Sequence, residues 1–231
     1  MATSTTHGGE TVSIGETEIA SHRLAGGLFI ALAAEFVTAI MLAAAMAPDY
    51  DFNEAAISDL GVISETALLF NASLVFVGLC NVVGGYLFYR VHGRRWIAAV
   101  FALAGIGAVG AGVFTLDSEG LHGLFALVAF LAFNVQAIAT ATRLRGAMRT
   151  FSVLAGVLGL VFVVLMAIGD GGNTAAFGAI GHGGTERMIV YPVMIWLIAL
   201  GGYLLGLRDT DSLAGDGDRT AGLTDAPDAS D

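Results

Sequence analysis

Seven polar or ionisable side chains with catalytic or ligating potential lie in three short segments between long apolar runs. From the N-terminus they are Ser58, Asp59, Asp117, His122, His182, Glu186 and Arg187. Catalytic zinc sites use three imidazole or carboxylate ligands and leave one position open. These residue types therefore indicate metal-assisted hydrolysis of a lipid or other membrane substrate. In this hypothesis His122 and His182 bind zinc, a carboxylate is the third ligand, and Arg187 holds an anionic group.

Other interpretations of the same residues remain open. Ser58, His122 and Asp117 are the residue types of a nucleophilic triad, whose geometry the sequence does not fix. The sequence has no HExxH motif and no pair of histidines on one helical face, so the ligand spacing is not diagnostic of a metal. Loop side chains that meet only water fit the pattern too. Glu186 also suits the start of a helix, with Thr185 as the N-cap.

A further carboxylate, Glu35, lies about halfway along an apolar run. An ionised carboxylate at that depth costs about 2.5–3.5 kcal/mol, so Glu35 is either protonated or paired with polar groups. The amides available for pairing are Asn71, Asn81, Asn134 and Gln136. This arrangement predicts, as an alternative function, a small transporter or channel in which Glu35 and Asn71 bind the solute. Hydrogen-bonded helix packing is the structural alternative.

Composition indicates the elements that position these residues. The chain is 56% hydrophobic and only 13% charged, with a mean hydropathy of +0.78. Apolar runs of about 20 residues match the length needed to cross a bilayer, and in lipid such runs must be helices. We expect an all-α transmembrane bundle with antiparallel neighbours and six spans at 24–47, 66–89, 95–116, 121–142, 150–168 and 187–207. The bundle occupies residues 23–208, and polar composition predicts disordered tails over 1–22 and 209–231.

The charged residues predict how the bundle is oriented. Nine of the ten arginines fall at one end of the predicted helices, and only Arg187 falls at the other. The positive-inside rule therefore predicts a multi-pass cell-membrane protein with both termini in the cytoplasm. The chain has a net charge of −10, and the tail beyond 208 is rich in aspartate, which excludes nucleic acid as a partner of that tail. The absence of lysine is similar to haloarchaeal proteins.

Small residues predict close helix packing. Ala104, Ala108 and Gly112 recur at four-residue spacing in the third span, where they let two helices approach closely. We therefore expect this span to be central in the bundle. Similar faces could hold a second copy or a membrane partner, which gives a third functional hypothesis, a non-catalytic accessory subunit.

Three motifs resemble a known membrane family. They are the stretch 57–61 after Ala47-Pro48-Asp49-Tyr50, the turn from Gly112 to His122, and the segment 183–192. Together they resemble the archaeal and bacterial family called domain of unknown function 998, over about residues 24–207. The resemblance implies no activity, but it implies that Ser58-Asp59, His122 and Thr185-Glu186-Arg187 are recurring polar positions and that Glu35 is a departure. A fainter likeness to metal hydrolases related to alkaline ceramidases is incomplete by one histidine.

Overall fold

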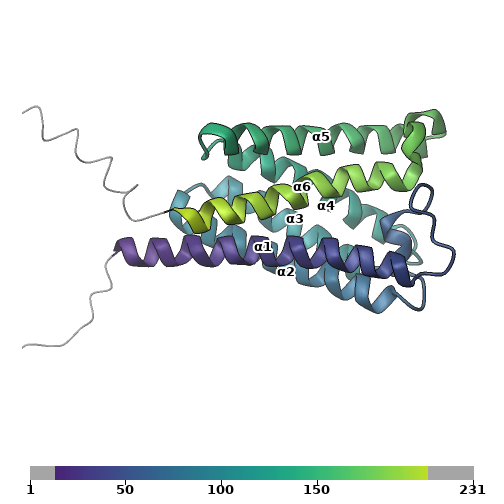
Figure 1. The fold of residues 1–231 in the computed structure, drawn as a ribbon, viewed down its shortest axis with the longest axis horizontal. Helices are drawn as coiled ribbons and strands as arrows, with labels where there is room; N and C mark the ends of the chain where they lie inside the picture. Colours follow the sequence, from purple (N-terminus) through teal and green to yellow (C-terminus); the bar gives the residue numbers. More distant parts are fainter. Residues whose placement is uncertain (1–13, 208–231) are drawn as a thin grey trace, which may run out of the picture.

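A computed structural model describes residues 14–207, and its long helices are the predicted membrane spans (Figure 1). In chain order they are α1 (Ile14–Met46), α2 (Ala67–His92), α3 (Arg95–Val113), α4 (Leu121–Ala141), α5 (Gly146–Asp170) and α6 (Gly181–Gly206). Two short 3-10 helices, η1 (Ile57–Gly61) and η2 (Thr174–Ile180), precede α2 and α6. All six long helices are apolar enough to cross a membrane, so the predicted all-α, multi-pass architecture is confirmed.

The six helices form a ring in chain order. Each packs against its neighbours in sequence, and α1 closes the ring by packing against α6 (Figure 1). Gly26 and Gly201 make that closure possible, because a Cβ on either glycine would meet the backbone carbonyl oxygen of the other. The side chains of Phe29, Phe101 and Trp196 are fully buried inside the ring. Small residues therefore let α1 and α6 approach, and aromatic rings fill the interior.

The third span is not central, contrary to the expectation from its small residues. α3 packs chiefly against α2 and α4, as any member of the ring packs against its two neighbours. Gly78 of α2 and Gly105 of α3 face each other so closely that a Cβ on either would strike the carbonyl oxygen of the other. The small residues of α3 thus serve its contacts with both sequence neighbours, α2 and α4.

Two helices begin earlier than hydropathy predicts. α1 starts at Ile14, so residues 14–22 of the predicted N-terminal tail are helical, while 1–13 and the predicted tail 209–231 lie outside the described residues. α6 starts at Gly181 rather than near Arg187. Thr185 is therefore not an N-cap but an internal residue, whose hydroxyl donates to the carbonyl oxygen of Gly181 at 2.8 Å. Close packing of the glycine-rich start of α6 against the first connecting loop explains the earlier beginning.

We call the end of the ring at which α1 ends and α6 begins the distal end. It contains the connecting segment 47–66 with η1, the first turns of α4 and α6, the last turn of α5, and η2 (Figure 1). Among the described residues, Arg187 is the arginine at this end, and the others lie toward the opposite end. Arg208 and Arg219 lie outside the described residues. The predicted candidate residues other than Glu35 and Asn71 thus belong to the connections and helix ends of the distal end.

Candidate functional site

A crevice of about 390 Å³ opens at the distal end between α4, α5 and α6. Its polar lining combines one hydroxyl, two imidazoles and two carboxylates, from Ser58, His122, Asp170, His182 and Glu186. Its apolar lining includes Leu127 and Phe130 of α4, Val163 and Met166 of α5, and Ile189 of α6. The crevice therefore presents a polar end and an apolar wall to whatever occupies it.

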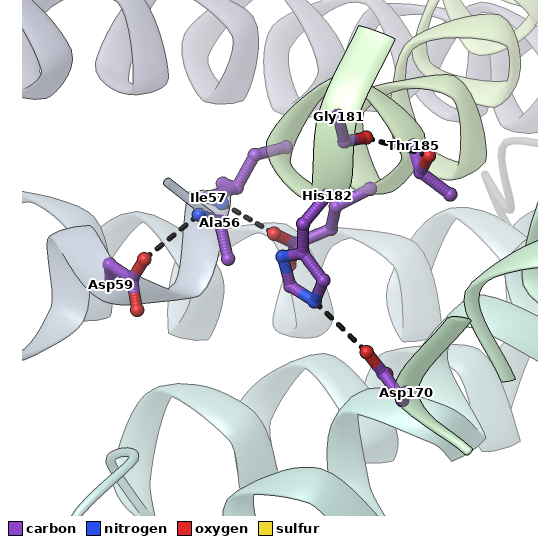
Figure 2. A network of polar contacts seen from close by, with 8 residues as sticks. Ala56, Ile57, Asp59, Asp170, Gly181, His182 and Thr185 are labelled. Carbon is purple, nitrogen blue, oxygen red and sulfur yellow. Dashed lines mark hydrogen bonds and ion pairs between the residues drawn. The ribbon is translucent and has the colours of Figure 1, made fainter. Parts of the chain in front are cut away.

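Glu186 is the most deeply buried carboxylate of the crevice, with 4% of its surface exposed. One of its oxygens accepts a short hydrogen bond from the backbone N–H of Ile57, at the start of η1. η1 is in turn held by Asp59, whose side chain accepts the N–H of Ala56 at 2.8 Å (Figure 2). The position of the Glu186 carboxylate is thus fixed by an element 129 residues away in the sequence.

His122 is held in one orientation by the end of α3. Its Nδ1 lies 3.1 Å from the carbonyl oxygen of Ala111 and 2.9 Å from that of Phe114. Because carbonyl oxygens only accept hydrogen bonds, Nδ1 must carry a proton, and Nε2 is left with the free lone pair in the neutral ring. The side chain is 5% exposed, and no hydrogen bond from Nε2 to any residue of 14–207 is formed. Nε2 is therefore available to a ligand in the crevice.

His182 and Asp170 form the more exposed side of the crevice. Nε2 of His182 lies 3.2 Å from Oδ1 of Asp170, so the pair joins the start of α6 to the end of α5 (Figure 2). The ring of Phe177 from η2 contacts the imidazole edge-on, with ring centroids 5.1 Å apart. This second histidine is thus oriented by a carboxylate and an aromatic ring.

A second, smaller cavity lies beneath the polar residues, inside the ring. It has a volume of about 60 Å³ and is lined almost entirely by apolar side chains, such as Phe36, Phe70 and Met194. Ser58, His122 and Glu186 line both this cavity and the crevice. These three residues therefore border both the crevice and the apolar cavity.

Three predicted distal residues have other partners. Asp59 caps η1, as described above. Asp117 accepts a short hydrogen bond from the hydroxyl of Thr115 within its own turn. Arg187 faces the connecting segment, where its guanidinium donates to the carbonyl oxygens of Phe52 and Ala55 at 3.0 and 3.2 Å. None of the three lines the crevice, so the structure brings together only Ser58, His122, His182 and Glu186 of the predicted set.

Arg187 fastens the first connecting segment to α6. Besides the two loop carbonyls, it donates to the carbonyl oxygen of Gly183 at 2.7 Å and to the hydroxyl of Tyr50 at 2.7 Å. Tyr50 donates onward to the carbonyl oxygen of Ala56 at 2.7 Å. Burial raises the pKa of Tyr50 to about 12, although the charge of Arg187 acts in the opposite direction. Arg187 and Tyr50 thus hold η1 where its N–H meets Glu186.

The residues predicted for transport lie elsewhere. The side chain of Glu35 accepts a hydrogen bond from the hydroxyl of Ser73 at 2.8 Å and lines open grooves between α1 and α2. Asn71 donates to the carbonyl oxygen of Gly61 at 2.8 Å. Asn81 and Gln136 form a reciprocal amide pair with distances of 3.0 and 3.2 Å. The expected pairing of Glu35 with amides is therefore replaced by pairing with a serine.

The side chains do not provide a complete zinc site. Within residues 14–207, no group of three or more His, Cys, Asp or Glu side chains is arranged to hold a metal ion. His122 offers Nε2, and His182 offers Nδ1 because its Nε2 lies against Asp170. The described side chains thus offer two imidazole nitrogens but no preformed group of three ligands.

Sequence patterns did not single out two residues of the distal end. Asp170 lines the crevice but ends an apolar run before two glycines, so it resembles an ordinary turn residue. Tyr50 lies in the motif Ala47-Pro48-Asp49-Tyr50 used for the resemblance, but its role depends on the position of Arg187. The one sequence feature that could have identified Asp170 is its position near the glycine-rich loop that contains His182, the residue with which it pairs.

Comparison with known proteins gives one match. Neither the curated proteins nor the solved structures include a significant match to this chain. The family model described as "Protein of unknown function (DUF998)" matches residues 23–203, which include all but the outermost residues of the first and last spans and every residue of the crevice. The chain therefore belongs to the DUF998 family of membrane proteins.

Proposed function

We propose that the chain hydrolyses a lipid or other membrane-associated substrate bound in the distal crevice. The observation that carries the proposal is that a buried carboxylate and an oriented imidazole, Glu186 and His122, line one crevice with an apolar wall. An apolar wall suits the hydrocarbon part of a membrane substrate, and a proton-transfer group beside it suits bond cleavage. We infer a reaction that needs no metal.

His122 is the proposed general base. In the neutral ring Nε2 takes a proton from a water molecule as the water oxygen attacks the carbonyl carbon of the substrate. The same Nε2–H then gives that proton to the leaving oxygen or nitrogen as its bond to the carbonyl carbon breaks. The carbonyls of Ala111 and Phe114 hold the Nδ1–H and stabilise the positive ring that forms in between.

Glu186 is the proposed electrostatic partner. A carboxyl group that ionises in a water-poor site stabilises a transient imidazolium without reorganising. The Ile57 N–H keeps the carboxylate in place. Ser58 lines the same crevice and is the candidate for contact with the substrate or the attacking water.

The proposal is tested by turnover of lipid esters and amides by the purified chain in nanodiscs. We expect His122→Gln to lower the rate by about 10²–10⁴-fold, the usual contribution of a general base. His92→Gln is the matched control, because His92 contacts the carbonyl oxygen of Phe88 at the opposite end and should leave the rate unchanged. EDTA should leave the rate unchanged as well. Equal rates for His122→Gln and the wild type would sink the proposal, and loss with EDTA that zinc restores would overturn its metal-free form.

A further inference from the structure

The charge of the crevice lining points to the class of head group that it accepts. The lining contains two carboxylates, Asp170 and Glu186, and two histidines, but no arginine, and the chain has no lysine. An anionic head group placed there would meet carboxylates without a permanent positive charge on the lining. The lining is therefore complementary to a positive head group.

Arg187 does not supply the missing positive charge to a ligand. It is 7% exposed, and its terminal nitrogens donate to the oxygens of Phe52, Ala55, Gly183 and Tyr50. A guanidinium can bind an anion only through N–H groups that are free to point at it. Since these donors face the segment 47–66 and the carbonyl oxygen of Gly183 in α6, the arginine nearest to the site in sequence is used for folding.

The free nitrogen of His122 is an independent sign that the crevice takes a ligand together with a water molecule. Nε2 belongs to a side chain that is 5% exposed and has no partner in the described part of the chain, and His122 lines both cavities. With Nδ1 protonated, a neutral ring offers Nε2 only as an acceptor. This acceptor can take a hydrogen bond from a water molecule that attacks a bound ligand.

We propose that the crevice binds an amphiphile whose head is a primary or secondary ammonium group. The ammonium N–H groups donate to the carboxylates of Glu186 and Asp170 and leave Nε2 of His122 to the attacking water, while the alkyl part lies against Leu127, Phe130 and Met166. A quaternary ammonium has no N–H to donate to the carboxylates and binds more weakly. This inference rests on the proposed function, because it names the substrate class of the same site.

Binding of three probes with the same chain length tests the inference. Decylamine, decanol and decanoate are titrated calorimetrically into the full chain in neutral-lipid nanodiscs, with empty nanodiscs subtracted. We expect decylamine to bind at least tenfold more tightly than either of the others, and more tightly than decyltrimethylammonium. Decanoate binding as tightly as decylamine, or no decylamine binding above that of empty nanodiscs, overturns the inference.

Charge-neutral variants distinguish binding of decylamine in the crevice from its general attraction to an acidic protein. Asp170→Asn and Glu186→Gln should each weaken decylamine binding at least fivefold. Asp117→Asn and Glu119→Gln, exposed carboxyl positions at the same end but outside the crevice, are the controls and should leave binding unchanged. Equal weakening by both pairs overturns the inference. Decylamine binding without turnover of any lipid contradicts only the hydrolytic proposal, and turnover without amine preference contradicts only this one.

Discussion

Glu186 and Glu35 are both carboxylates in membrane-spanning helices, but they differ in their surroundings. Glu186 is 4% exposed, accepts a backbone N–H from η1, and shares a crevice with two histidines. Glu35 is partly buried, accepts one hydroxyl from Ser73, and lines grooves between α1 and α2. Depth in an apolar run shows that a charge is costly, whereas the other side chains that reach it decide what it can do.

The largest expected difference between the two carboxylates is in turnover. Glu186→Gln keeps an oxygen that accepts the Ile57 N–H but removes the negative charge, so the fold should persist while the rate falls about 100-fold. Glu35→Gln should leave the rate unchanged, because no catalytic candidate contacts Glu35. Both variants are compared in the same nanodisc assay. A drop for Glu35→Gln as large as that for Glu186→Gln would reverse the comparison.

Arg187 provides the next test, since its contacts hold η1 against Glu186. Arg187→Met removes four hydrogen bonds to loop and helix oxygens, and hydrogen bonds to charged groups contribute about 1.5–3 kcal/mol each before compensation. We expect a loss of roughly 3 kcal/mol in unfolding free energy and faster amide exchange across residues 47–66. Arg149→Met, at the opposite end, is the control. Unchanged exchange in Arg187→Met would mean that other contacts position η1.

The sequence predicted the helices that carry the two carboxylates, but not where each helix begins. Six apolar runs predicted six helices, since hydrophobic length and backbone satisfaction in lipid leave few alternatives. The start of α6 was missed because seven glycines between 169 and 186 favour a loop, whereas Gly181 and Gly183 in fact let the carbonyls of Asn53 and Ala55 approach the helix. Propensity was overridden by tertiary packing at that point.

The site was predicted by residue type more than by geometry. Ser58, His122, His182 and Glu186 follow from the rule that connections at one end of an antiparallel bundle converge, and they share the crevice. The opposite orientation of Arg187, one residue after Glu186, depends on carbonyls of the segment 47–66 that no periodicity reveals. The replacement of amides by Ser73 at Glu35 likewise depends on the rotation of α2 about its axis.

Tyr50 offers a pH test of the clamp beside Glu186. Burial raises its pKa from 10.0 to about 12, so its neutral form is favoured in the folded state and its contribution to stability is fully present below pH 10. That contribution should decline as the pH rises from about 10 through about 12. Absorbance titration at 295 nm should show a late-ionising tyrosine that Tyr50→Phe removes. If Tyr50→Phe instead removes a tyrosine that ionises near pH 10, Tyr50 is not buried beside Arg187.

Replacement of Ser73 has the smallest expected effect and tests how tightly Glu35 is held. Ser73→Ala removes the hydroxyl that donates to Glu35 at 2.8 Å, but the carboxylate lines open grooves and can find other donors there. We expect a loss of about 1 kcal/mol or less in unfolding free energy, with turnover unchanged. Ser152→Ala is the contrast, because the Ser152 hydroxyl is buried and accepts the indole N–H of Trp196 at 2.7 Å, so its removal should cost more. If Ser73→Ala destabilises the protein as much as Ser152→Ala, the hydrogen bond between Ser73 and Glu35 is as important for stability as one in the core. Glu35 would then not differ from Glu186 in how tightly its surroundings hold it.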